Sequence, residues 1–469
     1  MDSKNKELLK KTTLYSIGNF GSKVLSFAMI PLYSFYLDKN EFGYFDLIST
    51  IVALTIPLGT LQLTDSLLRW LLLAKNEESK SKVITNSFII TIISIIIIFI
   101  ILFIARIIWD IPHQSLISIL LITSIIYPLA QQITRGLGEN KLFAINGVIF
   151  TFIYLILNVV FLIYFELKIE ALFLSTIISN VICFANLLYV TKFYKYFNLK
   201  YFNIVNCKEY LKYSIPLIPN TISWWLINSA NKFIILYFLT LGANGLFGMA
   251  NRFPSILIMI NSIFIMAWQE SAIIQFNKDG SKEFFSNILE KLFSIQAFFG
   301  SILILLSHFV VSKFIDPIYY DSWKLMPILY LSVIFSSISG FYGSIYLGAK
   351  QTNGIFKTTI SAGIFNVIAA FILTKYFGLI GVAIGTCLGF MMLTVIRYFD
   401  TKRFMVLDYS NSTFWIFSLL LTVSIVLSYI NNSFLTLIGI FLIFLVVIIM
   451  KKNQISVGYL KIKNKINEH

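Results

Sequence analysis

The stretch Ser87–Ala105, SFIITIISIIIIFIILFIA, carries no charged residue over its whole length. An α-helix needs about 20 consecutive apolar residues to cross the hydrocarbon core of a bilayer. The run is continuous in apolar residues and does not alternate with polar ones as the strands of a membrane barrel do. It therefore predicts a membrane-spanning helix, in which every backbone polar group is satisfied internally.

Runs of this kind recur through all 469 residues, which are 58% hydrophobic and only 13% charged. Soluble domains are nearer a quarter charged. The expected fold class is an all-α polytopic membrane protein with about fourteen transmembrane helices, and twelve is the alternative even number. The charged N-terminal segment leads into a full-length span without a cleavage site, so no signal peptide is expected.

Lys and Arg are distributed unevenly between the two sides of the predicted membrane. With the N-terminus in the cytoplasm, 28 of the 37 Lys and Arg residues fall in cytoplasmic segments and 6 in external ones. This bias is the positive-inside pattern and predicts that both termini are cytoplasmic. The net charge of +15 is explained by topology, so nucleic acid is not expected as a partner.

Two halves of the chain show weak internal similarity at a separation of roughly 200 residues. Tyr15–Ile17 matches Tyr213–Ile215, and Gly43–Phe45 aligns with Gly245–Phe247. The halves predict two six-helix lobes related by a pseudo-two-fold axis, followed by two further helices. The expected divisions are residues 1–192 (N-terminal lobe), 193–213 (linker), 214–403 (C-terminal lobe) and 404–469 (two helices and a basic tail). The basic, aromatic linker fits both an interfacial helix on anionic lipid and a solvated connection.

Three cations lie inside predicted spans, where an unpaired charge is costly: Lys23, Lys232 and Arg252. No carboxylate is expected mid-span beside them, so an anionic substrate such as a phosphate or diphosphate is the predicted partner. Alternatives stay open: Lys23 could pair with Asp46, and Arg252 could extend to the interface. The supporting polar residues of the predicted cavity are Asn19, Trp224, Asn228 and Asn231, although such asparagines often only join helices.

Motifs of known enzymes and metal sites are missing from the sequence. The three cysteines and three histidines are scattered, so no metal site and no cofactor are predicted. Neither a Walker A nor a GxSxG pattern occurs, and no long external loop offers catalytic groups. The chain is therefore expected to be a transporter, not an enzyme, and no catalytic residue is assigned.

Several segments resemble the Wzx-type polysaccharide flippases of the multidrug/oligosaccharidyl-lipid/polysaccharide (MOP) exporter superfamily. These segments are PLYSFYLDKNEFGYFDL (Pro31–Leu47), LLRW (Leu67–Trp70), NKFIILYFLTLGANGLFGMANRFPSIL (Asn231–Leu257) and AWQESA (Ala267–Ala272). The resemblance implies two lobes around a central cavity lined by cations. It also implies a polyprenyl-diphosphate-linked oligosaccharide as substrate, moved across a bacterial cytoplasmic membrane by alternating access for O-antigen, capsule or exopolysaccharide synthesis.

The same resemblance implies coupling to H⁺ or Na⁺ or use of the membrane potential, between which the sequence does not decide, and partners among polysaccharide polymerases or glycosyltransferases. Where many relatives read Asp-Arg, this chain reads Asn231-Lys232, which puts a coupling role at that position in doubt. Asp46 and Glu270 are the remaining coupling candidates, and a charge at the cytoplasmic rim is the alternative reading of Glu270. A lipid II flippase and a multidrug or cation antiporter of the same fold are the alternative functions.

Overall fold

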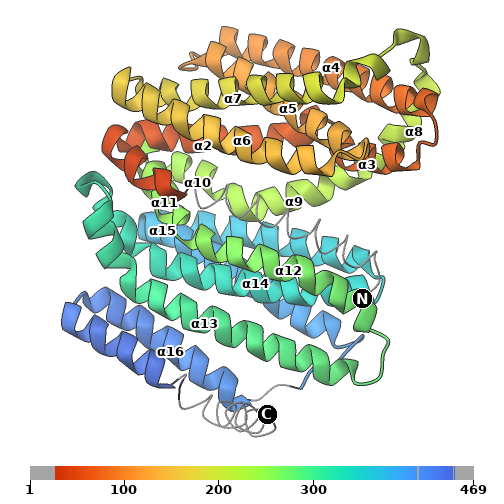
Figure 1. Ribbon diagram of the computed structural model, residues 1–469. Helices are drawn as coiled ribbons and strands as arrows, with labels where there is room; N and C mark the ends of the chain where they lie inside the picture. Colours follow the sequence, from red (N-terminus) through yellow and green to blue (C-terminus); the bar gives the residue numbers. More distant parts are fainter. Residues whose placement is uncertain (1–26, 409–410, 447, 449–469) are drawn as a thin grey trace, which may run out of the picture. The chain divides into compact units, whose positions relative to one another are not determined.

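A computed structural model of the chain describes residues 27–408, 411–446 and 448, and every regular element in these ranges is a helix (Figure 1). Nine helices of the described part are long and apolar enough to cross a membrane. The predicted all-helical membrane fold is thus confirmed, whereas the number of fourteen spans stays a prediction. One of the nine, α15 (Thr352–Thr401), is long enough to contain two of the predicted spans.

The chain divides into two compact units, the first ending at Arg252 and the second beginning at Phe253. The division into lobes at a linker over residues 193–213 stays a prediction. The helices of the first unit are Phe27–Tyr36, α2 (Lys39–Gly59), α3 (Leu63–Leu73), α4 (Glu77–Ile108), α5 (Gln114–Gly136), α6 (Asn140–Val159), η1 (Val160–Tyr164), α7 (Lys168–Thr191), η2 (Phe193–Tyr196), η3 (Leu199–Tyr201), α8 (Ile204–Ser214), η4 (Ile215–Leu217), α9 (Ile218–Ser229), α10 (Asn231–Phe238) and α11 (Leu241–Arg252). Those of the second unit are α12 (Pro254–Gln275), α13 (Ser281–Phe314), η5 (Pro317–Lys324), α14 (Met326–Gly348), α15, α16 (Asn411–Ile430) and Ser433–Val446.

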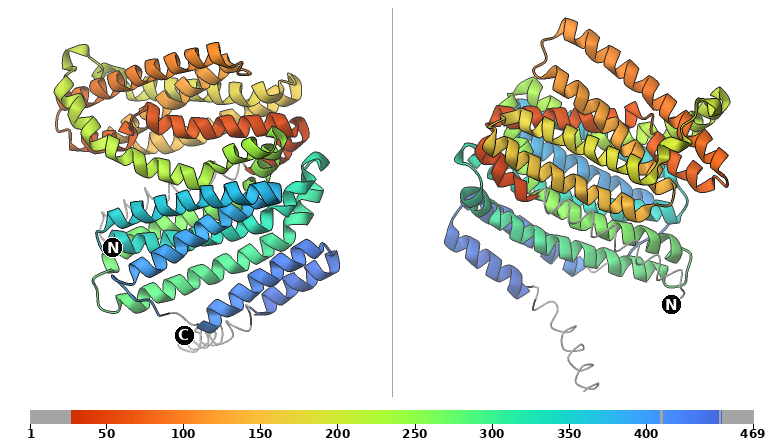
Figure 2. Two further views of the ribbon diagram at one scale, coloured as in Figure 1. Left: turned by 180° about the vertical axis from the view of Figure 1, so that it is seen from behind. Right: turned by 45° about the horizontal axis from the view of Figure 1, so that its top comes forward.

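Within the first unit, α2 packs along α11, and α5 contacts both α3 and α7, as two further views also show (Figure 2). Helix α2 begins at a capping box, in which the Asp38 carboxylate accepts from the Asn40 and Glu41 N–H groups and Glu41 accepts from the Asp38 N–H. This box satisfies backbone donors that a helix end leaves free. The cap therefore fixes where α2 starts and so the depth of every residue along it.

The second unit is built around α14, which packs against α12, α13 and α15. Of the residues in the apolar stretch of α14, 72% are buried inside the protein, the highest share among the nine apolar helices of the described residues. Helix α16 packs on α13. A helix that is apolar all round is expected at the centre of such a bundle.

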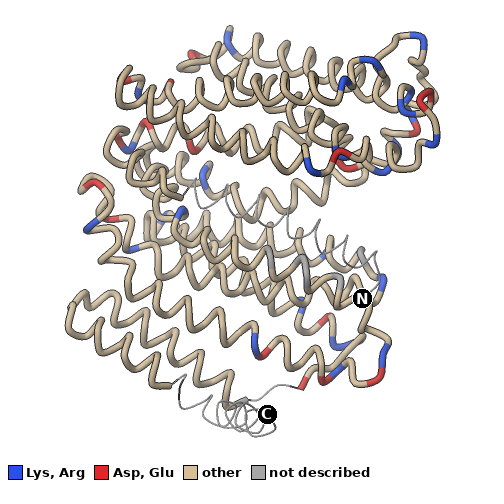
Figure 3. Tube along the Cα trace, in the orientation of Figure 1, with Lys and Arg blue, Asp and Glu red and all other residues tan. Residues whose placement is uncertain are grey.

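Helix α4 contains the isoleucine-rich run Ser87–Ala105, and the exposed residues of this run indicate which surface faces lipid. Its buried residues all lie in the first part of the helix, up to Ser94, whereas Ile97, Ile101 and Ile104 are exposed. Large exposed apolar side chains in a continuous run are expected of a surface that faces hydrocarbon. Charged residues lie mostly at the helix ends and in the connections of each unit (Figure 3).

The backbone interrupts two of the predicted spans and breaks α15 between two others. Leu61 and Gln62 have positive φ between α2 and α3, and Gln62 N–H donates to the oxygen of Pro57 over 2.8 Å. Only Ala230 separates α9 from α10, and there the Phe233 N–H donates to the Ala230 oxygen three residues back. In α15, Gly378 has φ 57° and ψ −135°, a conformation essentially confined to glycine, and it divides the helix into two.

Candidate functional site

Two of the predicted site residues, Asn19 and Lys23, lie outside the described residues. Lys232 lies in the first turn of α10, directly after the break at Ala230. Trp224 and Asn228 lie on α9, and Arg252 is the last residue of α11. Glu270 lies in α12, and its side chain is not described.

The Lys232 ammonium forms an ion pair with Asp46 on α2. Its Nζ lies 2.7 Å from Asp46 Oδ2, and the side chains of the two residues are 16% and 8% exposed. Nζ also donates to Thr50 Oγ1 over 2.7 Å and approaches the Asp46 backbone oxygen at 3.4 Å. Since Asp46 and Thr50 are four residues apart, they present both acceptors on one face of α2.

The expectation that no carboxylate accompanies the deep cations is therefore wrong for Lys232. The capping box starts α2 at Lys39, so Asp46 lies two turns inside the helix and not at its end. The alternative pairing of Asp46 with Lys23 stays a prediction, because Lys23 lies outside the described residues. A buried ammonium is tolerable only when it is paired and hydrogen-bonded, and here the protein itself supplies the anion.

The neighbouring tryptophan Trp225, which the sequence prediction passed over for Trp224, holds α9 against α2. Its indole N–H donates to the Thr50 backbone oxygen over 3.0 Å. Asn228 instead donates within its own helix, to the Trp224 oxygen over 2.8 Å, and is exposed. Asn231, beside Lys232, is buried. Thr50, whose hydroxyl accepts from the Lys232 ammonium, was not among the predicted supporting residues.

Close to the ion pair, α2 and α11 approach each other so tightly that no side chain fits between them. A Cβ on Gly43 would overlap the Leu241 carbonyl oxygen and lie 2.8 Å from the Gly245 nitrogen, and a Cβ on Gly245 would overlap the Lys39 oxygen. The Asn244 side-chain amide donates to the Gly43 oxygen over 2.8 Å, which ties the crossing together. A Cβ on Gly248 would lie only 2.9 Å from Asp46 Oδ2. The two glycines that the internal repeat aligns are therefore in contact with each other.

Arg252 lies against an aromatic ring of α2. Its guanidinium carbon lies 5.7 Å from the centre of the Phe42 ring on α2, a distance suited to cation–π attraction. Nearby, the hydroxyls of Tyr33 and Tyr154 are 2.9 Å apart. The first unit thus places two of the three predicted cations on neighbouring elements, one against a carboxylate and one against aromatic rings.

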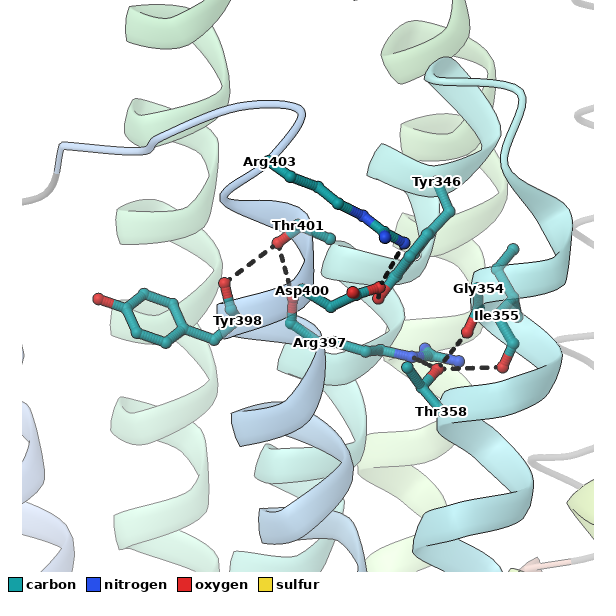
Figure 4. A network of polar contacts seen from close by, with 9 residues as sticks. All are labelled: Tyr346, Gly354, Ile355, Thr358, Arg397, Tyr398, Asp400, Thr401 and Arg403. Carbon is teal, nitrogen blue, oxygen red and sulfur yellow. Dashed lines mark hydrogen bonds and ion pairs between the residues drawn. The ribbon is translucent and has the colours of Figure 1, made fainter.

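A buried arginine that the sequence prediction had assigned to a cytoplasmic segment occurs in the second unit. Arg397 on α15 is 1% exposed and donates to the Ser339 backbone oxygen and to the hydroxyls of Thr358 and Thr359. Figure 4 shows its side chain reaching Thr358, while Asp400, one turn further on, accepts from Arg403 instead. The described partners of the Arg397 guanidinium are therefore neutral oxygens.

An apolar cavity of about 560 Å³ opens in the second unit among α13, α14, α15 and α16. Its lining includes Phe293, Ile334, Phe335, Phe414 and Leu421, and Glu290 is the one charged residue among the described lining side chains. A cavity of this character suits a hydrocarbon chain better than a polar headgroup. No group of three or more metal-ligating side chains occurs among the described residues.

A family model described as polysaccharide biosynthesis protein matches residues 8–273, which is more than half of the chain. The chain belongs to this family. The resemblance noted in Pro31–Leu47 and Asn231–Leu257 is thereby confirmed, since both segments lie inside the matched residues. Among curated proteins, none matches the chain.

Solved structures show the fold to which the family member belongs. The lipid II flippase MurJ in an inward closed conformation is similar with a TM-score of 0.75 at 17% identity, over 94% of this chain and 100% of that chain. An inward-facing multidrug resistance MATE family transporter of the MOP superfamily is similar with a TM-score of 0.63 at 17% identity, over 84% and 94%. A mutant of the Vibrio cholerae MATE transporter VcmN gives 0.57 at 14% identity, over 85% and 96%.

The chain shares its fold with these solved structures, and its many long apolar helices are those of a multi-pass membrane protein. At these identities the solved structures define the architecture alone. Within that architecture, the largely buried Lys232 is held by a carboxylate on another helix.

Proposed function

We propose that this protein flips a polyprenyl-diphosphate-linked oligosaccharide across the bacterial cytoplasmic membrane for surface polysaccharide synthesis. Membership of the polysaccharide biosynthesis protein family and a transporter fold support a flippase. A lipid-linked substrate is supported by the apolar cavity in the second unit, which offers hydrocarbon a place in the protein. Both termini would face the cytoplasm, where most Lys and Arg are predicted to lie.

The observation that carries the proposal is the Lys232–Asp46 pair. Lys232 keeps 16% of its side chain exposed, so an incoming group can reach it. A diphosphate bears more negative charge than a carboxylate and offers more acceptor oxygens, so it competes well for an ammonium. In this proposal Asp46 holds Lys232 while no substrate is bound and gives it up when the diphosphate arrives.

The exchange would also couple transport to an ion. Once released from Lys232, Asp46 would be a buried carboxylate without a cation, which is costly unless a proton or Na⁺ joins it. Asp46 is thus the proposed coupling residue, and Glu270 is a second candidate. Arg252 and Lys23 are proposed as further cations along the path of the diphosphate, with Asn19, Trp224, Asn228 and Asn231 facing the sugars.

The test replaces the chromosomal gene with variants and measures surface polysaccharide together with the lipid-linked oligosaccharide retained inside. Lys232→Ala is expected to abolish export and to accumulate the intermediate at normal protein levels, whereas Lys232→Arg retains part of the export. Lys168→Ala, which removes an exposed lysine also paired with a carboxylate on α2, is the matched control. Normal export by the Lys232→Ala variant would refute the proposal.

A multidrug or cation antiporter is the second candidate, because Asp46 provides the buried carboxylate that export of a cation requires. For this function Asp46→Asn would abolish drug resistance, while Lys232→Ala would leave it intact or raise it. A third arm, rescue of cells depleted of their lipid II flippase, separates transport of lipid II from transport of another lipid-linked glycan. Resistance or rescue without any effect on surface polysaccharide would favour one of these alternatives.

A further inference from the structure

The segment between α7 and α9 is fixed to α4 by two buried polar side chains. Thr85 donates to the Tyr196 oxygen and accepts from the Asn198 N–H. Asn86 donates to the Tyr201 oxygen over 3.0 Å and accepts from the Asn203 N–H over 2.9 Å. Because side-chain amides and hydroxyls replace a backbone ladder here, the segment holds one defined position beside the start of α4.

Aromatic and sulfur-containing side chains anchor the inner face of the same segment. Phe193, Cys207 and Tyr210 are buried, and the Tyr210 ring lies 5.3 Å from that of Trp70 on α3. The Cys207 thiol contacts Asn86 Oδ1 at 3.2 Å, and burial raises the pKa of this thiol above its ordinary value. The inner face is therefore packed against the first unit.

The outer face of the segment exposes several large apolar side chains. Leu199 and Val205 are each 69% exposed, and Phe197, Phe202 and Ile204 are also exposed. The segment follows the end of α7 and lies beside the beginning of α4, both of which are apolar enough to cross a membrane. Exposed leucine, valine, isoleucine and phenylalanine at the end of two such helices suit the headgroup–acyl boundary of a bilayer.

The exposed charge of this segment is mostly positive. Residues 192–213 contain five exposed lysines and a single acid, Glu209; the lysines are Lys192, Lys195, Lys200, Lys208 and Lys212. Among the described residues, none of these five forms an ion pair closer than 4 Å. Lys80 and Lys82, at the adjoining start of α4, are by contrast neutralised by Glu77 and Glu78.

A polar pocket of about 350 Å³ lies where the segment meets α4. It is lined by Lys82, Lys200, Asn203 and Asn206, together with Glu78, whose carboxylate lies 2.6 Å from Lys82. Glu78 forms its ion pair with Lys82 and attracts Lys200 only at longer range, so the Lys200 ammonium can contact a ligand in the pocket. Ammonium and amide N–H groups beside exposed apolar side chains match a phosphate joined to acyl chains.

From these observations we propose that residues 192–213 form a binding surface for anionic phospholipid headgroups of the membrane. In this proposal the headgroup phosphate contacts Lys200 in the polar pocket, Lys195 and Lys208 add attraction, and Leu199 and Val205 enter the acyl boundary. The inference is independent of the substrate proposed above.

The test uses the full-length protein in nanodiscs, with a fluorophore attached to Val205→Cys. The native cysteines Cys183, Cys207 and Cys387 are buried, and the unsubstituted protein is the labelling control. Brominated phosphatidylglycerol and brominated phosphatidylcholine serve as quenchers of known mole fraction. We expect phosphatidylglycerol to quench at a severalfold lower mole fraction than phosphatidylcholine.

Each lysine near an anionic surface contributes about fivefold to binding. Lys195→Gln/Lys200→Gln is therefore expected to raise the mole fraction of phosphatidylglycerol needed for half-quenching by about fivefold for each lysine removed, or about twenty-five-fold for both. Lys313→Gln/Lys375→Gln removes two exposed lysines elsewhere and is expected to leave it unchanged.

Equal quenching by the two lipids in the protein with all its lysines would overturn the proposal, since the surface would then be apolar without charge preference. Absence of quenching by either lipid would overturn it as well, because the segment would then lie in water and be open to a protein partner.

Discussion

Replacing Asp46 and Lys232 singly and together measures how strongly the Asp46–Lys232 ion pair stabilises the contact between α2 and α10. At 2.7 Å and an effective dielectric constant of about 20, the Coulomb attraction is about 6 kcal/mol. Desolvation of two poorly exposed side chains offsets several kcal/mol of this. Removing one partner leaves the other charge buried, so Asp46→Asn and Lys232→Met are each expected to lower the free energy of unfolding by about 3 kcal/mol.

The double variant Asp46→Asn/Lys232→Met leaves no unpaired charge. We expect it to lose about 3 kcal/mol in total and not about 6, which is a coupling energy of about 3 kcal/mol. The assay is equilibrium unfolding of the purified protein by sodium dodecyl sulfate in mixed micelles, followed by circular dichroism. The two single variants must give monodisperse protein before their free energies are compared.

A second pair on the same helix provides the control. Lys168 Nζ lies 3.3 Å from Glu41, but its side chain is 66% exposed, so water screens the interaction. The cycle Glu41→Gln/Lys168→Met is expected to give a coupling energy of at most about 1 kcal/mol. If the Asp46–Lys232 coupling were no larger than this control, the pair would be weak, and the account of Lys232 as a cation held by the protein's own anion would fail.

Three further outcomes follow from other contacts. Gly245→Ala forces a Cβ into the α2–α11 crossing and should lower thermal stability by about 1–3 kcal/mol, whereas Gly147→Ala, which meets nothing within 4 Å, should not. Asn86→Ala removes the hydrogen bonds that hold residues 192–213 against α4, so the rate of limited trypsin cleavage at the lysines of this segment should rise severalfold. Arg397→Met exchanges a guanidinium with neutral partners for an apolar chain and should change the unfolding free energy by under about 2 kcal/mol, whereas Thr359→Val, which leaves the charge less satisfied, should cost about 1–3 kcal/mol.

The fold was predictable because membrane helices are recognisable from composition. The run at Ser87–Ala105 forms α4 as expected, since no other structure satisfies its backbone in lipid. The break at Gly378 was also foreseeable, because two predicted spans flank it. What composition did not reveal was the interruption between α2 and α3, where Leu61 and Gln62 adopt positive φ without being glycine.

The candidate site was only half visible in the sequence. Lys232 stood out because a cation within an apolar run is costly wherever it lies. Its partner did not, because Asp46 lies 186 residues away and its depth depends on where the Asp38 cap starts the helix. Arg397 was missed because it lies near other basic residues and so resembled a membrane boundary. Only the packing of the helices shows that it is buried.

The contact between Gly43 and Gly245 limits which substitutions the α2–α11 crossing can tolerate. Gly43 and Gly245 are already the smallest residue, so a larger residue at one position cannot be compensated by a smaller residue at the other. Sliding one helix would break the bond from Asn244 to the Gly43 oxygen and carry Asp46 away from its lysine. Second-site suppressors of a substitution at either glycine are therefore expected to map away from the opposite glycine, in positions that let a whole helix tilt.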